Sequence, residues 1–138
     1  MKNTLISVLT VLAAVILFSC SKDEESERFR LLTAHLWRSD SLLVNGQDAG
    51  GTGGMLEKFK GDAKFAKDGS GYFGVYTGTW RFSYGEANIV IESDSLQLPL
   101  TATIVLLTES DFKITTIYPN LLNPSSPYNI RMTFKPKQ

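Results

Sequence analysis

From residue 36 to the end of the chain, apolar side chains recur at every second position, and this period limits the fold more than any other feature. In residues 79–84, for example, Trp80, Phe82 and Tyr84 alternate with polar side chains. A period of two is typical of β-strands that bury one face. No helical pattern separates these segments, which argues against a parallel α/β fold.

Turn signals divide the same region into about eight short strands. Asn45-Gly46 and Asp68-Gly69 are dipeptides that favour tight hairpins. The predicted strands are residues 36–44, 56–59 and 63–66 (one bent strand or two short ones), 71–76, 79–84, 88–92, 101–107, 112–117 and 130–135. Closing such a meander on itself removes its exposed edges. The sequence therefore predicts an all-β, up-and-down antiparallel barrel of about eight strands, whose interior holds side chains or one small ligand.

One short helix is predicted before the first strand, over residues 24–36. Phe29, Leu32 and Leu36 are spaced so that they share one helical face. The domain that follows the N-terminal segments, residues 28–138, has the length of a single folded unit. Basic and acidic residues number 14 each, so the composition gives no sign of the clustered basic face that nucleic-acid binding needs.

The first 19 residues have the layout of a signal peptide. Lys2 precedes an almost unbroken apolar run over residues 4–18. That run is about 15 residues long, whereas a membrane-spanning helix needs about 20 and the apolar core of a signal peptide about 7–15. Residues 1–19 are therefore predicted to be a signal peptide rather than a permanent transmembrane anchor.

The end of this segment, Leu17-Phe18-Ser19-Cys20, resembles the lipobox of bacterial lipoproteins. It lacks the A-x-A-like pattern of an ordinary secretory cleavage site. The resemblance implies cleavage before Cys20, acylation of its thiol with chains such as palmitate, and attachment to a membrane. More than one acyl chain gives stable anchoring. The alternative is a buried or unpaired thiol, which is unusual in an exported protein.

Residues 20–27 form a charged tether behind that cysteine. Within it, Lys22-Asp23-Glu24 resembles the surface-export signal of lipoproteins in one phylum of Gram-negative gut bacteria. The resemblance implies a lipoprotein of the outer membrane that is exposed at the cell surface. Charge runs are usually solvated segments, and a plain acidic tether would leave the domain at the periplasmic face.

The barrel region resembles bacterial lipocalin-like (calycin-type) domains of surface lipoproteins, over roughly residues 28–136. The similar pieces are residues 36–46, residues 65–71 and Gly78-Thr79-Trp80. The resemblance implies two structural roles. Trp37 would plug the closed end of the barrel, and Arg131 would stack on it in a cation–π contact worth about 0.5–2 kcal/mol.

The sequence offers no catalytic constellation, and we expect neither an enzyme nor a metal or other cofactor. His35 is the only histidine, which excludes a multi-histidine metal site, and thiolate sites need several cysteines. Asp94 and Asp111 fall in predicted turns, where Asp is common for conformational reasons. The loop of residues 50–54 lacks the Lys-Ser/Thr ending of a phosphate-binding loop, and is expected to be a mobile loop at one barrel mouth.

Five aromatic side chains are the candidates for lining a ligand cavity: Trp80, Phe82, Tyr84, Tyr72 and Tyr76. For Trp80 and Phe82, the strand period favours ordinary core packing over the lining of a cavity. In the predicted strand of residues 71–76, Tyr72 and Tyr76 would lie on one face and Phe73 and Val75 on the other. One of these two pairs is expected to face inward.

Two functions follow from these patterns. The first is a binding module whose barrel holds a small apolar or amphipathic ligand. The second is an interaction protein with a filled barrel, an accessory subunit of an outer-membrane complex, for which Leu121 and Leu122 would form an exposed apolar tip. The interior discriminates between them, because a filled barrel would be packed by the following side chains: Trp80, Phe82, Ile104, Ile114 and Met132.

Overall fold

The computed structural model describes residues 24–138. The predicted signal peptide, Cys20, Lys22 and Asp23 lie outside the described residues. The elements are α2 (Glu27–Ala34), β1 (Leu36–Val44), β2 (Gln47–Asp48), the 3₁₀ helix η1 (Glu57–Phe59), β3 (Asp62–Phe65), β4 (Ser70–Phe73), β5 (Tyr76–Ser83), β6 (Asn88–Glu92), β7 (Leu100–Leu107), β8 (Phe112–Tyr118) and β9 (Tyr128–Pro136).

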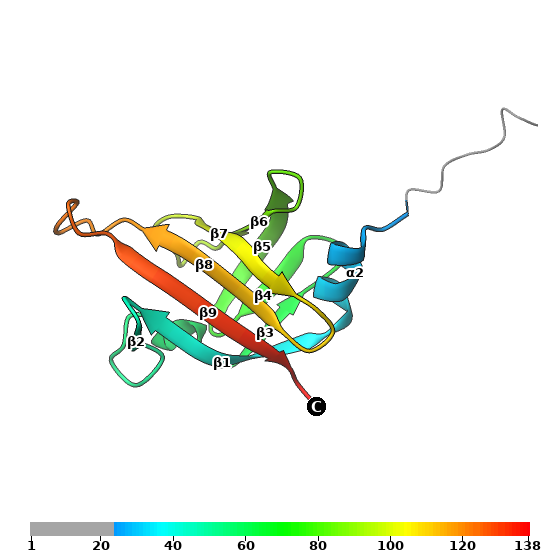
Figure 1. Cartoon of the computed structure of the whole chain (residues 1–138), viewed down its shortest axis with the longest axis horizontal. Coiled ribbons are helices and arrows are strands. Elements are labelled where there is room, and N and C mark those ends of the chain that lie inside the picture. The colour runs from blue at the N-terminus through cyan, green and yellow to red at the C-terminus, as the bar shows by residue number, and fades with distance from the viewer. Residues whose placement is uncertain (1–23) are drawn as a thin grey trace, which may run out of the picture.

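The strands close into an eight-stranded antiparallel barrel with one short helix, as predicted (Figure 1). From β3 to β9 each strand pairs with the next along the chain, and β1 pairs with both β3 and β9. The closing pair runs from Trp37 opposite Pro136 to Val44 opposite Ile130. The two-residue strand β2 pairs only with the end of β1. No helix among residues 24–138 is long and apolar enough to cross a bilayer.

Helix α2 is shorter than the predicted span of residues 24–36. It starts after Ser26, whose hydroxyl accepts a hydrogen bond from the Phe29 backbone N–H at 3.1 Å, the usual way in which serine caps a helix. It stops before His35, which has an extended backbone. Trp37 then donates its indole N–H to the Leu32 carbonyl at 3.0 Å, which ties the helix to the start of β1.

Two other predicted boundaries were wrong. Residues 56–59 include the 3₁₀ helix η1 instead of a strand. The chain reverses at Gly74 and Val75, so β4 ends at Phe73, and Gly78 lies inside β5 instead of separating two strands. Gly74 is needed at the turn because its φ is +62°, and a Cβ there would be 2.1 Å from the Lys58 carbonyl oxygen.

An aromatic core fills the half of the barrel nearest α2. Trp37, Phe65 and Phe112 are fully buried, and the Phe112 ring lies 5.6 Å from each of the other two. Trp80, Ile104, Ile114 and Met132 are also buried, with Phe82 packed against them. Because this core and the closing strand pair lie entirely within residues 24–138, this segment contains a complete folding unit.

Candidate functional site

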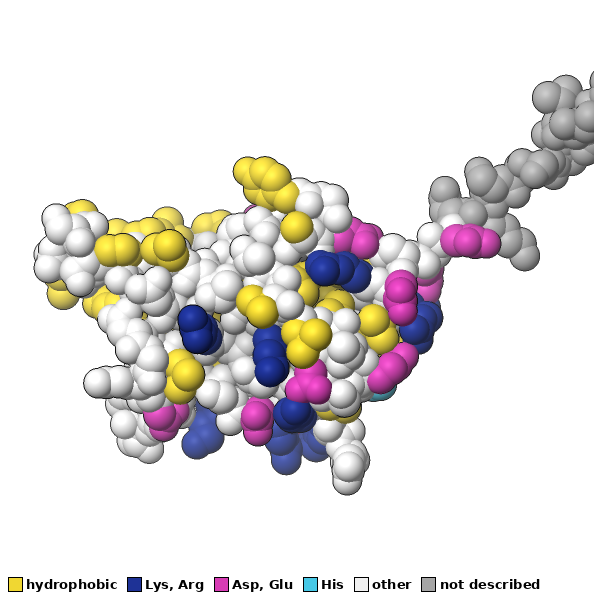
Figure 2. All heavy atoms as spheres, in the orientation of Figure 1, with side chains coloured by type: hydrophobic (Ala, Val, Ile, Leu, Met, Phe, Trp, Pro, Cys, Tyr) yellow, Lys and Arg dark blue, Asp and Glu magenta, His cyan; other side chains and the backbone are white. Residues whose placement is uncertain are grey.

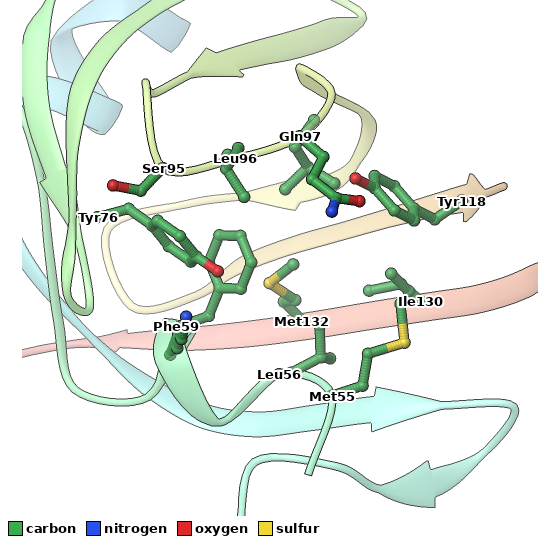
Figure 3. A pocket seen from close by; sticks show the side chains of 12 residues that line it. Met55, Leu56, Phe59, Tyr76, Ser95, Leu96, Gln97, Tyr118, Ile130 and Met132 are labelled. Atoms are coloured by element: carbon green, nitrogen blue, oxygen red, sulfur yellow. The ribbon is translucent and has the colours of Figure 1, made fainter. Parts of the chain in front are cut away.

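The barrel has two different ends. At one end α2 packs over the interior, where Leu32 is fully buried and the Phe29 ring lies 5.7 Å from Trp80. At the other end, η1, the loop between β6 and β7, and the ends of β8 and β9 surround a pocket of about 290 Å³ (Figure 3). We call this the mouth pocket.

The walls and floor of the mouth pocket are mainly apolar. Among the residues that line it are Met55, Leu56, Phe59, Leu96, Ile130 and Met132. Ile130 and Met132 come from β9 and are buried inside the barrel. The others come from η1 and irregular segments, whose contribution no strand period could reveal.

Two hydrogen bonds hold the loop of residues 50–54 in place beside this pocket. Gly50 N–H donates to the Asp48 carboxylate at 3.1 Å, and Gly53 N–H donates to the Glu57 carboxylate at 2.9 Å. The next residues, Met55 and Leu56, line the pocket. The loop therefore positions two apolar residues of the wall.

Tyr76 is the one polar side chain that is buried in the wall. It is 9% exposed, and its ring lies 4.8 Å from that of Phe59. Figure 3 shows its hydroxyl directed into the pocket, and no hydrogen bond joins that hydroxyl to any side chain or backbone group of residues 24–138. Burial, and then the neighbouring Tyr118, raise the pKa of Tyr76, so at neutral pH the phenol keeps its proton and is a hydrogen-bond donor.

The remaining polar groups of the pocket include donors but no carboxylate. Ser95, Gln97 and Tyr118 also belong to the lining, and Lys58 is its one charged residue. No Asp or Glu belongs to the lining. The pocket therefore combines an apolar body with hydrogen-bond donors and one positive charge.

The other four aromatic candidates do not line the mouth pocket. Trp80 is a core residue whose indole N–H donates to the Ala66 carbonyl at 2.9 Å, and Phe82 packs edge-on against it at 5.3 Å. Tyr84 is 83% exposed with a φ of +52° in the turn after β5, so the strand alternation does not extend to it. Tyr72 is 39% exposed on the outer face of β4.

The expected parity at the β4–β5 hairpin was wrong for a geometric reason. Phe73 and Tyr76 are direct partners across the hairpin, and direct partners of an antiparallel pair share one face. Both are therefore buried, whereas Tyr72 and Val75 are exposed. Because the turn at Gly74 and Val75 has two residues, the inward-facing positions are odd-numbered before it and even-numbered after it.

The predicted stack of Arg131 on Trp37 is also wrong. Trp37 is fully buried at the α2 end of β1. Arg131 is exposed on β9, between the inward Ile130 and Met132, and pairs with Leu43 near the far end of β1. The ring that packs edge-on against Trp37 is that of His35, at 5.3 Å.

Of the catalytic candidates, Asp111 and His35 take part in surface contacts, whereas no ion pair of Asp94 occurs among the described residues. Asp111 pairs with Lys135, and this contact, followed by a hydrogen bond from Ser110, lowers the pKa of Asp111. His35 contacts Glu109 at 2.8 Å. Within the described part of the chain, no three His, Cys, Asp or Glu side chains are grouped so that they could hold a metal ion.

The sequence matches no protein-family model and no curated protein. Its similarity to lipocalin-like domains stays a prediction, and the functional argument depends on the geometry of the site.

Proposed function

We propose that this protein is a lipoprotein of the outer membrane, exposed at the cell surface, whose barrel binds a small apolar or amphipathic ligand in the mouth pocket. The observation that carries the binding role is the mouth pocket itself, a cavity of about 290 Å³ with apolar side chains in its walls and the Tyr76 hydroxyl directed into it (Figure 3). A few polar groups within an apolar wall are typical of small-molecule sites, and a ligand in the pocket would offer the Tyr76 hydroxyl a hydrogen-bond partner. We propose no catalytic role and no cofactor.

The dimensions of the site are compatible with this role. The pocket volume of about 290 Å³ is at the lower end of the range of about 300–1,000 Å³ for small-molecule sites. Its mixture of apolar walls with a few polar groups is also typical of such sites. The membrane part of the proposal depends on Cys20 and on Lys22-Asp23-Glu24.

Native mass spectrometry of residues 24–138, incubated with a lipid and metabolite extract of bacterial envelopes, tests the binding role. We expect an added mass that leaves on gentle denaturation. Leu96→Trp, which places a large ring in the pocket wall, should abolish the added mass. Leu98→Trp is the matched control, because Leu98 belongs to the same loop, is exposed and lies outside the lining. A bare mass for the unmodified domain, or equal loss in both variants, would contradict the proposal.

A second function has its own support. Three large apolar side chains are exposed around the loop between β8 and β9, Ile117, Leu121 and Leu122, the last being 96% exposed. Figure 2 shows apolar side chains gathered at this end of the molecule. Together with the packed core, this favours an accessory subunit of an outer-membrane complex that docks through this loop. If Leu122→Ser abolishes co-purification with an outer-membrane protein while ligand binding is absent, the second function replaces the first.

A further inference from the structure

We infer that the ligand of the mouth pocket is a compact amphipathic monoanion, with a short or folded apolar body and one carboxylate or similar anionic group. The inference rests on the proposed binding function and specifies its ligand class. It also limits the ligand to one end of the barrel.

The size limit follows from what fills the rest of the interior. Towards α2 the barrel is occupied by the aromatic core of Trp37, Phe65, Trp80 and Phe112, all 5% exposed or less. The pocket volume of about 290 Å³ lies at the lower end of the range for small-molecule sites. A long acyl chain therefore has no path along the barrel axis, whereas a short or folded apolar group fits at the mouth.

The charge preference follows from the lining. The pocket is bordered by Lys58 and by the phenols of Tyr76 and Tyr118, and by no carboxylate. A cationic ligand would meet one ammonium group and no counter-charge. A carboxylate would accept hydrogen bonds from a protonated phenol and offset the charge of Lys58, and charge-assisted hydrogen bonds of this kind are stronger than neutral ones.

The fold places the two main donors on the same side of the pocket. The Val75 backbone N–H donates to the Lys58 carbonyl at 2.9 Å, and Tyr76 is the next residue along the chain. The 4.8 Å contact between the Phe59 and Tyr76 rings holds η1 against β5 at the same place. The head group of the ligand would therefore lie beside Lys58 and Tyr76, with its apolar body against Met132 and Ile130 of β9.

Lys58 has no ion-pair partner among residues 24–138. Lys60, two residues later, is also exposed and unpaired there, but it does not line the mouth pocket. The pair provides a matched comparison, because replacing either lysine removes one charge from the same short segment.

The test is isothermal titration of residues 24–138 with octanoate, octanol, octylamine and palmitate, below their micelle concentrations. We expect octanoate to bind about tenfold or more tightly than octanol and octylamine, and palmitate to bind no better than octanoate. In NMR spectra, octanoate should shift the methyl signals of Met55 and Met132, which line the pocket.

Variants locate the charge and the hydrogen bond. Lys58→Met and Tyr76→Phe should each weaken octanoate binding about tenfold, whereas Lys60→Met should leave it unchanged. Lys58→Met should leave octanol binding unaltered, a result that a general loss of folding would not give. Unfolding midpoints of each variant provide a second check of the fold.

The outcomes separate the inference from the proposed function. Equal binding of octanol and octanoate would overturn the charge preference, and tighter binding of palmitate would overturn the size limit, while both results would leave a ligand-binding barrel. If none of the four compounds binds and the envelope extract adds no mass, the proposed binding function fails together with the inference.

Discussion

Gly78 lies where β5 passes so close to the end of β6 that no side chain fits. A Cβ at this position would be 1.9 Å from the Glu92 carbonyl oxygen and 3.0 Å from the Cα of Ser93. These are backbone atoms, which cannot swing aside as the tip of a flexible side chain can. The absence of a side chain at Gly78 therefore keeps β5 and β6 in their register.

We expect Gly78→Ala to destabilise the domain by about 1–3 kcal/mol or more, because the added methyl group must force two paired strands apart. The urea unfolding midpoint of residues 24–138, followed by circular dichroism, measures this. Gly51→Ala is the control, since its Cβ would meet only the Asp48 carboxylate at 3.9 Å, and a change within about 0.5 kcal/mol is expected there. Equal midpoints for the two variants would show that the strands can accommodate a methyl group at Gly78, which would contradict the prediction.

At the scale of the elements, Asp62 joins three segments that are distant in sequence. Its carboxylate lies at the start of β3, accepts a hydrogen bond from Arg38 of β1 at 3.0 Å and another from Lys137, just after β9, at 2.7 Å. These contacts, with that of Lys137 the larger, lower the pKa of Asp62 below its ordinary value of 3.8.

A carboxylate whose pKa is lowered by folding stabilises the fold above its ordinary pKa, and this contribution is lost as the pH falls through the folded-state value. We therefore expect Asp62→Asn to lower the thermal midpoint at neutral pH and to have progressively less effect as the pH falls below 3.8. Asp94→Asn is the matched control, because no ion pair of Asp94 occurs among the described residues. A pH-independent difference between Asp62→Asn and the parent would contradict the role of the charge.

Regular elements could be predicted from the sequence, and irregular ones could not. The bounds of the first strand, residues 36–44, were predicted correctly, because period-two alternation precedes a strong Asn45-Gly46 turn signal. Residues 56–59 were misassigned, since three residues of 3₁₀ helix are too few to show a period. Which residues of β4 and β5 face inward could not be predicted either, because the two-residue turn between the strands was not recognised and it interrupts the simple alternation.

The site was harder to predict than the fold for the same reason. Of the five aromatic candidates, Tyr76 alone lines the mouth pocket. Met55, Leu96 and Lys58 come from loops and from η1, where only the folded chain brings them together. Met132 was predicted as a residue of a filled interior, but the alternation gave no sign that Met132 and Ile130 border a cavity.

At the scale of the whole molecule, the end of the barrel that α2 covers lies opposite the end that holds the mouth pocket. The described chain enters at Glu24 beside α2, and the loop between β8 and β9 lies at the opposite end (Figure 1). In a protein anchored through Cys20, the α2 end would lie nearer the membrane, and the mouth pocket would open away from it.

We expect the full chain, expressed in its bacterial host, to incorporate a palmitate analogue and to fractionate with the outer membrane. Cys20→Ala should abolish both, because no other thiol is present in the sequence. Externally added protease should degrade the domain in intact cells, whereas replacement of Lys22, Asp23 and Glu24 by alanine should protect it. Protection of the unmodified protein would place the domain at the periplasmic face, and labelling of Cys20→Ala would contradict lipidation.

The closing pair of β1 and β9 also sets the order in which this barrel can be completed during synthesis. β1 is the first of the described strands to be made, yet one of its two neighbours in the barrel is β9, the last of them. Until residues 128–136 have emerged, β1 and β8 each keep an unpaired edge, and such edges readily pair with other chains. A nascent chain that stops before β9 is therefore an open sheet with two unpaired edges, and the barrel closes only when β9 has left the ribosome.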